Sequence, residues 1–81
     1  MKNLYVYAYP VQMITFQLVE DNKILTNENC TFTDIIRTTA NYLSKESIER
    51  IYVVGDTTFA DKIRTMIIDN FKIEVERIRN D

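Results

Sequence analysis

A short apolar run between two helical patterns constrains the fold of this chain more than any other feature. The run is Ile51–Val54, "IYVV", and the tyrosine hydroxyl is its only polar side-chain group. In residues 31–45 and 57–71, apolar residues recur three and four positions apart, as on one face of a helix. A continuously apolar strand flanked by helices is typical of a parallel strand buried on both faces. We therefore predict an α/β fold with a strand at 50–54.

Four further strands are predicted outside this central unit. Residues 3–9 and 11–20 alternate their side chains in the two-residue period of a strand and are rich in β-branched and aromatic types. The polar segment 20–23 is a turn signal, and residues 24–26 form a short third strand after it. These three strands are expected to form an antiparallel meander. The charged, alternating segment 72–78 has the pattern of an edge strand.

The order of these elements predicts a single five-stranded mixed sheet in one compact domain, residues 1–81. If the strand at 50–54 lies beside the first strand and the strand at 72–78 lies beyond it, the strand order is 3-2-1-4-5. Right-handed connections then place both helices on one face of the sheet.

The two helical patterns begin with nearly the same residues, "TFTDIIRT" and "TFADKIRT", 27 positions apart. Ten residues are identical over the 21 positions from Thr31 and from Thr58. One interpretation is duplication of a helix–strand unit, and the other is a shared need for similar helix starts. In both copies the Thr is followed three residues later by an acid, Asp34 or Asp61, which predicts a capping box.

Composition excludes several kinds of chemistry. The chain has no histidine and one cysteine, Cys30, so a disulfide framework, a cysteine-based zinc cluster and histidine catalysis are ruled out. Cys30 is expected to be a partly buried structural residue. No cofactor or metal is expected. The net charge of −2 and pI of about 5.0 disfavour nucleic acid as a partner.

The expected compartment is the cytoplasm. No run of about 18 apolar residues suggests a membrane span, and the first residues lack the pattern of a signal peptide. The 11 Ile and 7 Asn residues match an AT-rich coding genome, such as that of a low-GC bacterium or its phage.

The predicted strand order resembles the core of the ribonuclease-H-like fold, which ribonucleases H, resolvases, transposases and actin-like ATPases share. The resemblance is one of topology and covers nearly the whole chain. It implies metal-binding acids in the middle of the first strand and after the fourth. Asp56 matches the second position, but no acid lies between Met1 and Val19. The resemblance thus implies a degenerate, non-catalytic version, in which Gly55-Asp56 serves as a strand-to-helix turn.

The first strand carries the most suggestive surface. Its tyrosines alternate with Leu4, Val6 and Ala8, which suit packing beneath helices. The tyrosines would then line the sheet face that no helix covers. Met13, Thr15 and Gln17, together with Tyr52 or Val53, would extend that face. The interface candidates are Tyr5, Tyr7, Tyr9, Met13 and Tyr52.

We therefore expect a small non-enzymatic module that binds a protein partner or itself, as a phage or mobile-element accessory protein would. The binding surface would be the tyrosine-lined face or the edge of the strand at 72–78. One alternative is a metal-dependent nuclease remnant centred on Asp56. Another is single-stranded nucleic-acid binding by stacking on the tyrosines, and a third is that the tyrosines only pack on their neighbours. Arg50, Arg77 and Arg79 are expected to form a modest basic strip.

Overall fold

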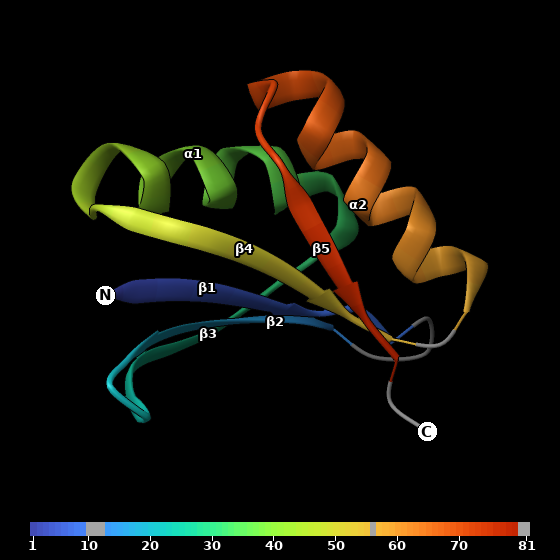
Figure 1. The fold of residues 1–81 in the computed structure, drawn as a ribbon. Helices are drawn as coiled ribbons and strands as arrows, with labels where there is room; N and C mark the ends of the chain where they lie inside the picture. The colour runs from blue at the N-terminus through green and yellow to red at the C-terminus, as the bar shows by residue number, and fades with distance from the viewer. Residues whose placement is uncertain (10–12, 56, 80–81) are drawn as a thin grey trace.

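The computed structural model describes residues 1–9, 13–55 and 57–79 and shows one five-stranded mixed sheet with two helices (Figure 1). The strand order is β3-β2-β1-β4-β5, which confirms the predicted 3-2-1-4-5 arrangement. The elements are β1 (Lys2–Tyr7), β2 (Ile14–Glu20), β3 (Lys23–Cys30), α1 (Ile35–Lys45), β4 (Ile48–Val54), α2 (Thr58–Phe71) and β5 (Val75–Ile78), with a 3-10 turn at Phe32–Asp34.

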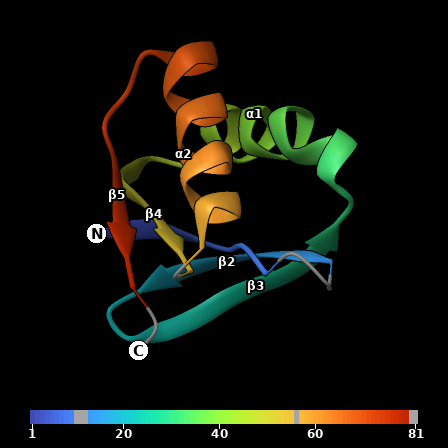
Figure 2. The ribbon, with the colours of Figure 1, turned by 90° about the vertical axis from the view of Figure 1, so that its right-hand side faces the viewer.

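The sheet has an antiparallel half and a parallel half. β2 pairs antiparallel with both β1 and β3, whereas β4 pairs parallel with both β1 and β5. Both helices cover the same side of the sheet, as Figures 1 and 2 show from two directions. The other side, called here the open face, has no helix over it. Neither helix of the described chain is long and apolar enough to cross a membrane.

The core lies between the helices and the covered side of the sheet. Alternate strand positions supply it, because successive side chains of a strand point to opposite faces. Removing each large apolar side chain from water stabilises the fold by roughly 1.5–3 kcal/mol. The buried strand residues include Leu4, Val6, Ile14, Phe16, Leu18, Ile51, Val53 and Val75, and the helices add Ile35, Ile63 and Ile67.

β3 is much longer than the predicted strand at 24–26. The turn before it contains two residues with positive φ, Asp21 at 51° and Asn22 at 67°, so it is a tight two-residue hairpin. Glu20 therefore pairs directly with Lys23, and the ladder continues to Cys30. The extension was not predicted because residues 27–29 are all polar and are of types that strands seldom contain.

β5 is shorter than the predicted strand at 72–78, because α2 ends in a left-handed residue. Lys72 has φ 55°, and its backbone N–H donates to the carbonyl of Ile68 at 2.8 Å. This helix C-cap occupies the first residue of the predicted strand. The ladder with β4 starts only at Val75.

The predicted capping boxes are wrong. The Thr31 hydroxyl lies 3.3 Å from a carboxylate oxygen of Asp34 and makes no cap to a backbone N–H, since a 3-10 turn precedes α1. The N-cap of α2 is Thr57, one residue before the predicted Thr58, and its side chain also makes no cap. Asp61 instead pairs with Arg77 of β5.

The single glycine, Gly55, sits where β4 turns toward α2. It is buried, and its N–H donates to the carbonyl of Ile78 at 2.9 Å. A Cβ at this position would lie 2.8 Å from the carbonyl oxygen of Ala8 and 2.9 Å from the Cβ of Ala60. Glycine is therefore required by the close approach of α2 and of Ala8, the residue after β1, rather than by an unusual backbone angle.

Candidate protein-binding face

Three of the predicted interface residues meet on the open face. The Tyr5 and Tyr52 rings lie 4.9 Å apart between centroids at 21°, and the Tyr5 and Tyr7 rings lie 6.4 Å apart at 22°. Tyr5 and Tyr52 are also register partners of β1 and β4. These three residues, called here the tyrosine cluster, are half-buried by one another and present ring surface away from the helices.

The structure resolves the alternative at the β4 position. Val53 is fully buried and pairs with Val6, which is also fully buried. Tyr52, one residue earlier, must therefore point to the other face, where it meets Tyr5. Tyr52 belongs to the open face and Val53 to the core.

The other two candidates lie beside the cluster. Tyr9 follows β1 and is half-buried, and it is near enough to Tyr7 to influence its ionisation. Met13 lies immediately before β2 and is 51% exposed, outside the stacked rings. The predicted candidates Tyr5, Tyr7 and Tyr52 thus stack on one another, whereas Met13 lies outside the cluster, and their role in binding stays a prediction.

The hydroxyl of Tyr7, the last residue of β1, stays neutral well above neutral pH. Burial raises the pKa of Tyr7, and the neighbouring Tyr5 and Tyr9 raise that pKa further. The cluster therefore offers apolar ring surface, and the Tyr7 hydroxyl can donate or accept hydrogen bonds.

An apolar extension of the cluster was missed in the sequence. Val54 and Ile78 lie in one register row with Tyr7, across β4 and β5. Ile78 is 37% exposed, so the row brings apolar surface to the edge of the sheet. Finding these residues needed the register between β4 and β5, which no sequence pattern supplied.

The opposite side of the cluster is bordered by uncharged polar pairs. The Thr15 hydroxyl donates to the side-chain oxygen of Asn29 at 2.8 Å, and the Gln17 amide donates to that of Asn27 at 3.3 Å. Both pairs are register partners of β2 and β3. A neutral hydroxyl and amide border around an aromatic centre resembles the composition of protein interfaces.

One pair of charged side chains on this face, Arg50 and Glu76, neutralises itself. Arg50 donates to a carboxylate oxygen of Glu76 at 2.9 Å, and both residues are about half exposed. Arg50 reaches the open face because Glu49 is an extra residue between the register pairs Lys2–Ile48 and Asn3–Arg50.

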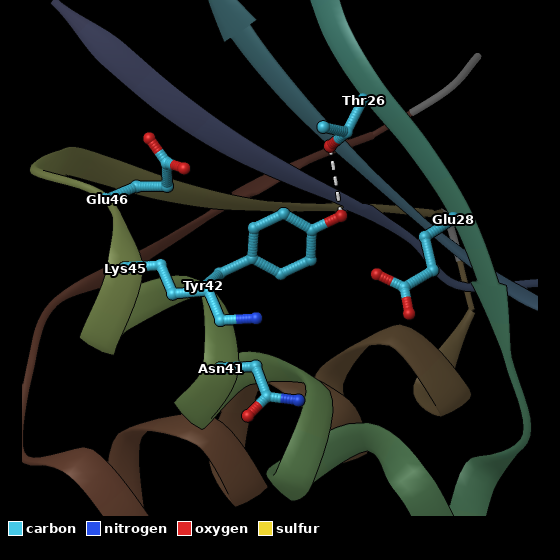
Figure 3. A pocket seen from close by; sticks show the side chains of 6 residues that line it. All are labelled: Thr26, Glu28, Asn41, Tyr42, Lys45 and Glu46. Carbon is cyan, nitrogen blue, oxygen red and sulfur yellow. Dashed lines mark hydrogen bonds between the residues drawn. The ribbon is translucent and has the colours of Figure 1, made fainter.

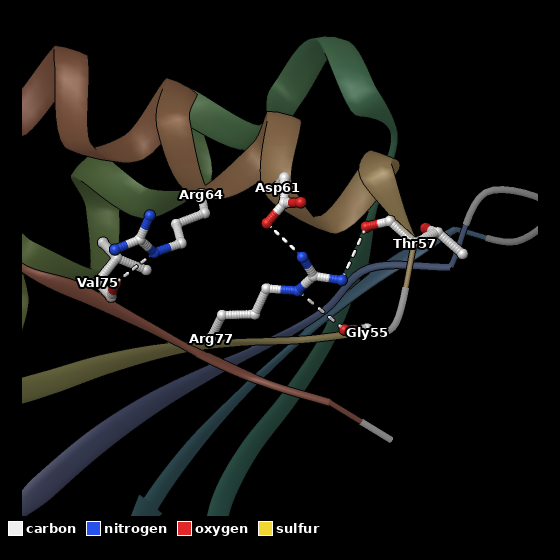
Figure 4. A network of polar contacts seen from close by, with 6 residues as sticks. All are labelled: Gly55, Thr57, Asp61, Arg64, Val75 and Arg77. Carbon is white, nitrogen blue, oxygen red and sulfur yellow. Dashed lines mark hydrogen bonds and ion pairs between the residues drawn. The ribbon is translucent and has the colours of Figure 1, made fainter. Parts of the chain in front are cut away.

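The predicted basic strip is therefore not formed. Arg77 lies on the helix-covered side, where its side chain is only 13% exposed and its guanidinium pairs with Asp61 (Figure 4). It also donates to the backbone carbonyls of Gly55 at 3.1 Å and Thr57 at 3.0 Å. Arg77 ties the start of α2 to β5 and adds no positive charge to the open face.

A side chain of the same molecule already bonds a backbone group of β5. Arg64 of α2 donates through Nε to the backbone carbonyl of Val75 at 2.7 Å (Figure 4). β5 is also only four residues long. Short length and a covering side chain both reduce the capacity of an edge strand to pair with another chain, so the β5 edge is the weaker of the two predicted surfaces.

The remaining sequence candidates give no catalytic arrangement in the described residues. Cys30 is buried, and that burial raises the pKa of its thiol. Asp56 lies outside the described residues, so the nuclease hypothesis stays a prediction. Within residues 1–9, 13–55 and 57–79, no three His, Cys, Asp or Glu side chains gather to hold a metal ion.

The fold and the open face together define a small α/β sheet protein with one uncovered aromatic face. No protein-family model matches the sequence, and no curated protein matches it. The structure is similar to part of the crystal structure of Pelota from Archaeoglobus fulgidus, with a TM-score of 0.68 over 98% of this chain. The identity is 6%, and the match spans 26% of the Pelota chain. At that identity the similarity shows the fold alone.

Proposed function

We propose that this chain is a non-enzymatic protein-binding module and that its open face is the binding surface. The observation that carries the proposal is the tyrosine cluster, a stack of half-buried rings. It lies on the sheet face that no helix covers (Figure 2). Tyrosines supply large contact area with little conformational freedom to lose, so they are enriched where proteins bind one another.

The chemistry around the cluster supports a protein partner with a largely uncharged surface. Tyr7 and Ile78, at the two ends of the row, offer apolar contact, whereas Val54 between them is buried. The amides of Asn27 and Asn29 offer hydrogen bonds at the border. The partner would bury the rings and satisfy these amides at the rim. The Ile- and Asn-rich composition remains the support for an origin in a phage or mobile element.

Single-stranded nucleic acid is the second candidate, because bases stack on aromatic rings. The Arg50–Glu76 pair argues against it, since this arginine is already neutralised. Backbone phosphates need unpaired cations. Fluorescence anisotropy with single-stranded oligonucleotides at two salt concentrations separates the two functions, and tight, salt-sensitive binding would favour nucleic acid.

The protein-binding proposal is tested by affinity capture from the native host followed by calorimetry with the captured partner. Two variants probe the face: Tyr7→Lys places a charge inside the cluster, and Gln17→Lys places one beside it without removing a ring. Each should weaken binding about tenfold or more, because a charge must then be desolvated in the interface.

The matched control is Thr65→Lys, which adds the same charge at an exposed position of α2. It should bind like the original chain. If both face variants keep full affinity while circular dichroism shows an intact fold, the open face is not the binding surface.

A further inference from the structure

The two edges of the sheet differ sharply in protection. β3 is the longest strand, with eight residues, and the first seven are exposed. In Figure 2 it forms the lower border of the sheet, with both helices above. β5, at the other edge, is half as long and has a backbone carbonyl bonded by Arg64. An uncovered edge strand presents unpaired backbone groups to another strand.

The side chains of β3 add little protection. The strand contains no proline, and its only lysine is the first residue, Lys23. Ile24 is 58% exposed and Leu25 is 46% exposed. Leu25 is an extra residue in the ladder with β2, and this bulge is the one edge-protecting device of the strand. The ladder from Thr26 onward is regular.

The two charges of β3 have no ionic partner among the described residues of their own chain. None of the ion pairs includes Lys23 or Glu28. The two residues lie toward opposite ends of the strand and have opposite signs. An antiparallel copy of the same strand would bring each lysine near the glutamate of the other copy, whereas a parallel copy would oppose like charges.

One register satisfies both charges. The ladder with β2 skips Leu25, so the two positions before Thr26 are Ile24 and, beyond it, Lys23. The two positions after Thr26 are Asn27 and Glu28. Lys23 and Glu28 are thus each two ladder positions from Thr26 and point to the same side of the sheet. A two-fold axis at Thr26 places Lys23 of each copy directly opposite Glu28 of the other.

Neighbouring registers are poorer. An axis at Glu28 would set the two glutamates against each other, which is destabilising. An axis at Asn27 would form no lysine–glutamate pair. The charge pattern therefore selects Thr26 as the centre of the pairing.

The helix-covered side leaves room for the lysine of a second copy. A pocket of about 290 Å³ lies between β3 and α1, and Thr26 and Glu28 line it (Figure 3). Its floor is fixed by Tyr42, whose hydroxyl lies 3.0 Å from that of Thr26. A lysine opposite Glu28 would lie at the mouth of this pocket, beside the carboxylate.

We infer that two copies of this chain pair antiparallel through β3, centred on Thr26, to form one ten-stranded sheet. An axis relating antiparallel neighbouring strands stands perpendicular to the sheet, so both copies keep their helices on the same side. The two tyrosine clusters then face one direction, and the dimer presents two open faces side by side. This dimer does not depend on the proposed function of those faces.

Sedimentation velocity over a range of concentrations tests the pairing with a charge exchange. Lys23→Glu and Glu28→Lys should each weaken dimerisation about tenfold or more, because both opposite-charge pairs become like-charge pairs. When the two variants are mixed, both pairs are restored, and a heterodimer should form. Asp69→Lys, an exposed charge change on α2, is the matched control and should dimerise normally.

Three results would overturn the inference: a monomer at every concentration, a dimer unaffected by either variant, or no heterodimer in the mixture. Hydrogen exchange adds a second readout, since β3 amides should become protected as concentration rises. Protection that appears only with another protein would mean that β3 pairs with that protein instead. Tyr7→Lys should leave this dimer unchanged, so failure of the face proposal and failure of the pairing can be told apart.

Discussion

The rings of Phe32 and Phe59 lie 5.9 Å apart between centroids and are tilted by 35°. These two residues are equivalent in the repeated segments "TFTDIIRT" and "TFADKIRT", so the matching helix starts pack against each other. Phe59 is half-buried and contacts the core, whereas Phe32 is more exposed and lies beneath the ammonium of Lys62 at 5.3 Å. The repeat thus joins the two helices at one end.

Phe59→Ala should lower the free energy of unfolding by about 2 kcal/mol, and Phe32→Ala by about 1 kcal/mol, because less of Phe32 is buried. In a double-mutant cycle the two should couple by about 0.5–1.5 kcal/mol, as contacting aromatic pairs do. Urea denaturation of the two single variants and the double variant measures this. Strictly additive effects would show that the rings do not interact.

Gly55→Ala should destabilise the chain by about 1–3 kcal/mol, since the new methyl group would overlap atoms of Ala8, directly after β1, and of Ala60 in α2. One of these atoms is the backbone oxygen of Ala8, which cannot move without shifting β1. Thermal unfolding followed by circular dichroism checks the prediction. Ser47→Ala, at an exposed position, is the control, and an equal stability of both variants would contradict the close packing.

Arg77→Met should cost about 1–3 kcal/mol of stability, because it leaves the buried carbonyl of Gly55 without its side-chain donor. Arg50→Met removes a pair that is about half exposed and should cost less than about 1 kcal/mol. The two arginines are equivalent in the repeat, so the comparison isolates the effect of their surroundings. Chemical denaturation of both variants under one condition measures it, and equal losses would contradict it.

Stability should fall at alkaline pH. Burial raises the pKa of Tyr7 and of Tyr42, and it raises the pKa of the Cys30 thiol; the hydrogen bond to Glu46 raises the pKa of Lys2. A raised folded-state pKa means that the folded chain holds its proton longer than the unfolded chain. The stability contributed by these protons is complete below the unfolded values and is lost as pH rises through the folded values.

Because the ordinary values run from 9.0 for cysteine to 10.5 for lysine, the loss should begin near pH 9. Urea midpoints measured from pH 7 to pH 11 follow it. Tyr7→Phe removes one of the shifted groups, so its stability should fall less steeply above pH 10. An identical slope for both proteins would show that Tyr7 is ionised equally in the folded and unfolded chains.

The sheet order could be predicted because the strongest local patterns were also the ones that set the topology. The apolar run at 51–54 correctly marked a central parallel strand, although helices cover only one of its two faces (Figure 1). The alternation of Leu4 with Tyr5 assigned the two faces of β1. The tyrosine cluster followed directly from that alternation. Tertiary packing strengthened these preferences and opposed none of them.

The predictions that were wrong concern the length of β3, the basic strip and the capping boxes. Each depends on a feature that no local sequence pattern indicates. The extent of β3 depends on left-handed angles at Asp21 and Asn22. The opposite directions of Arg50 and Arg77 depend on the extra residue in β4, which turns one copy of the repeat relative to the other. Asp61 pairs with Arg77, which is distant in sequence, instead of capping the start of α2.

The sheet uses alternate positions of the same strands for two separate tasks. The residues beneath the helices hold the chain together, whereas those on the open face contribute much less to the core. Substitutions on the open face can therefore accumulate with little loss of folding. A sheet of this shape can therefore be formed by sequences that have almost nothing in common, because only every second strand position has to be apolar.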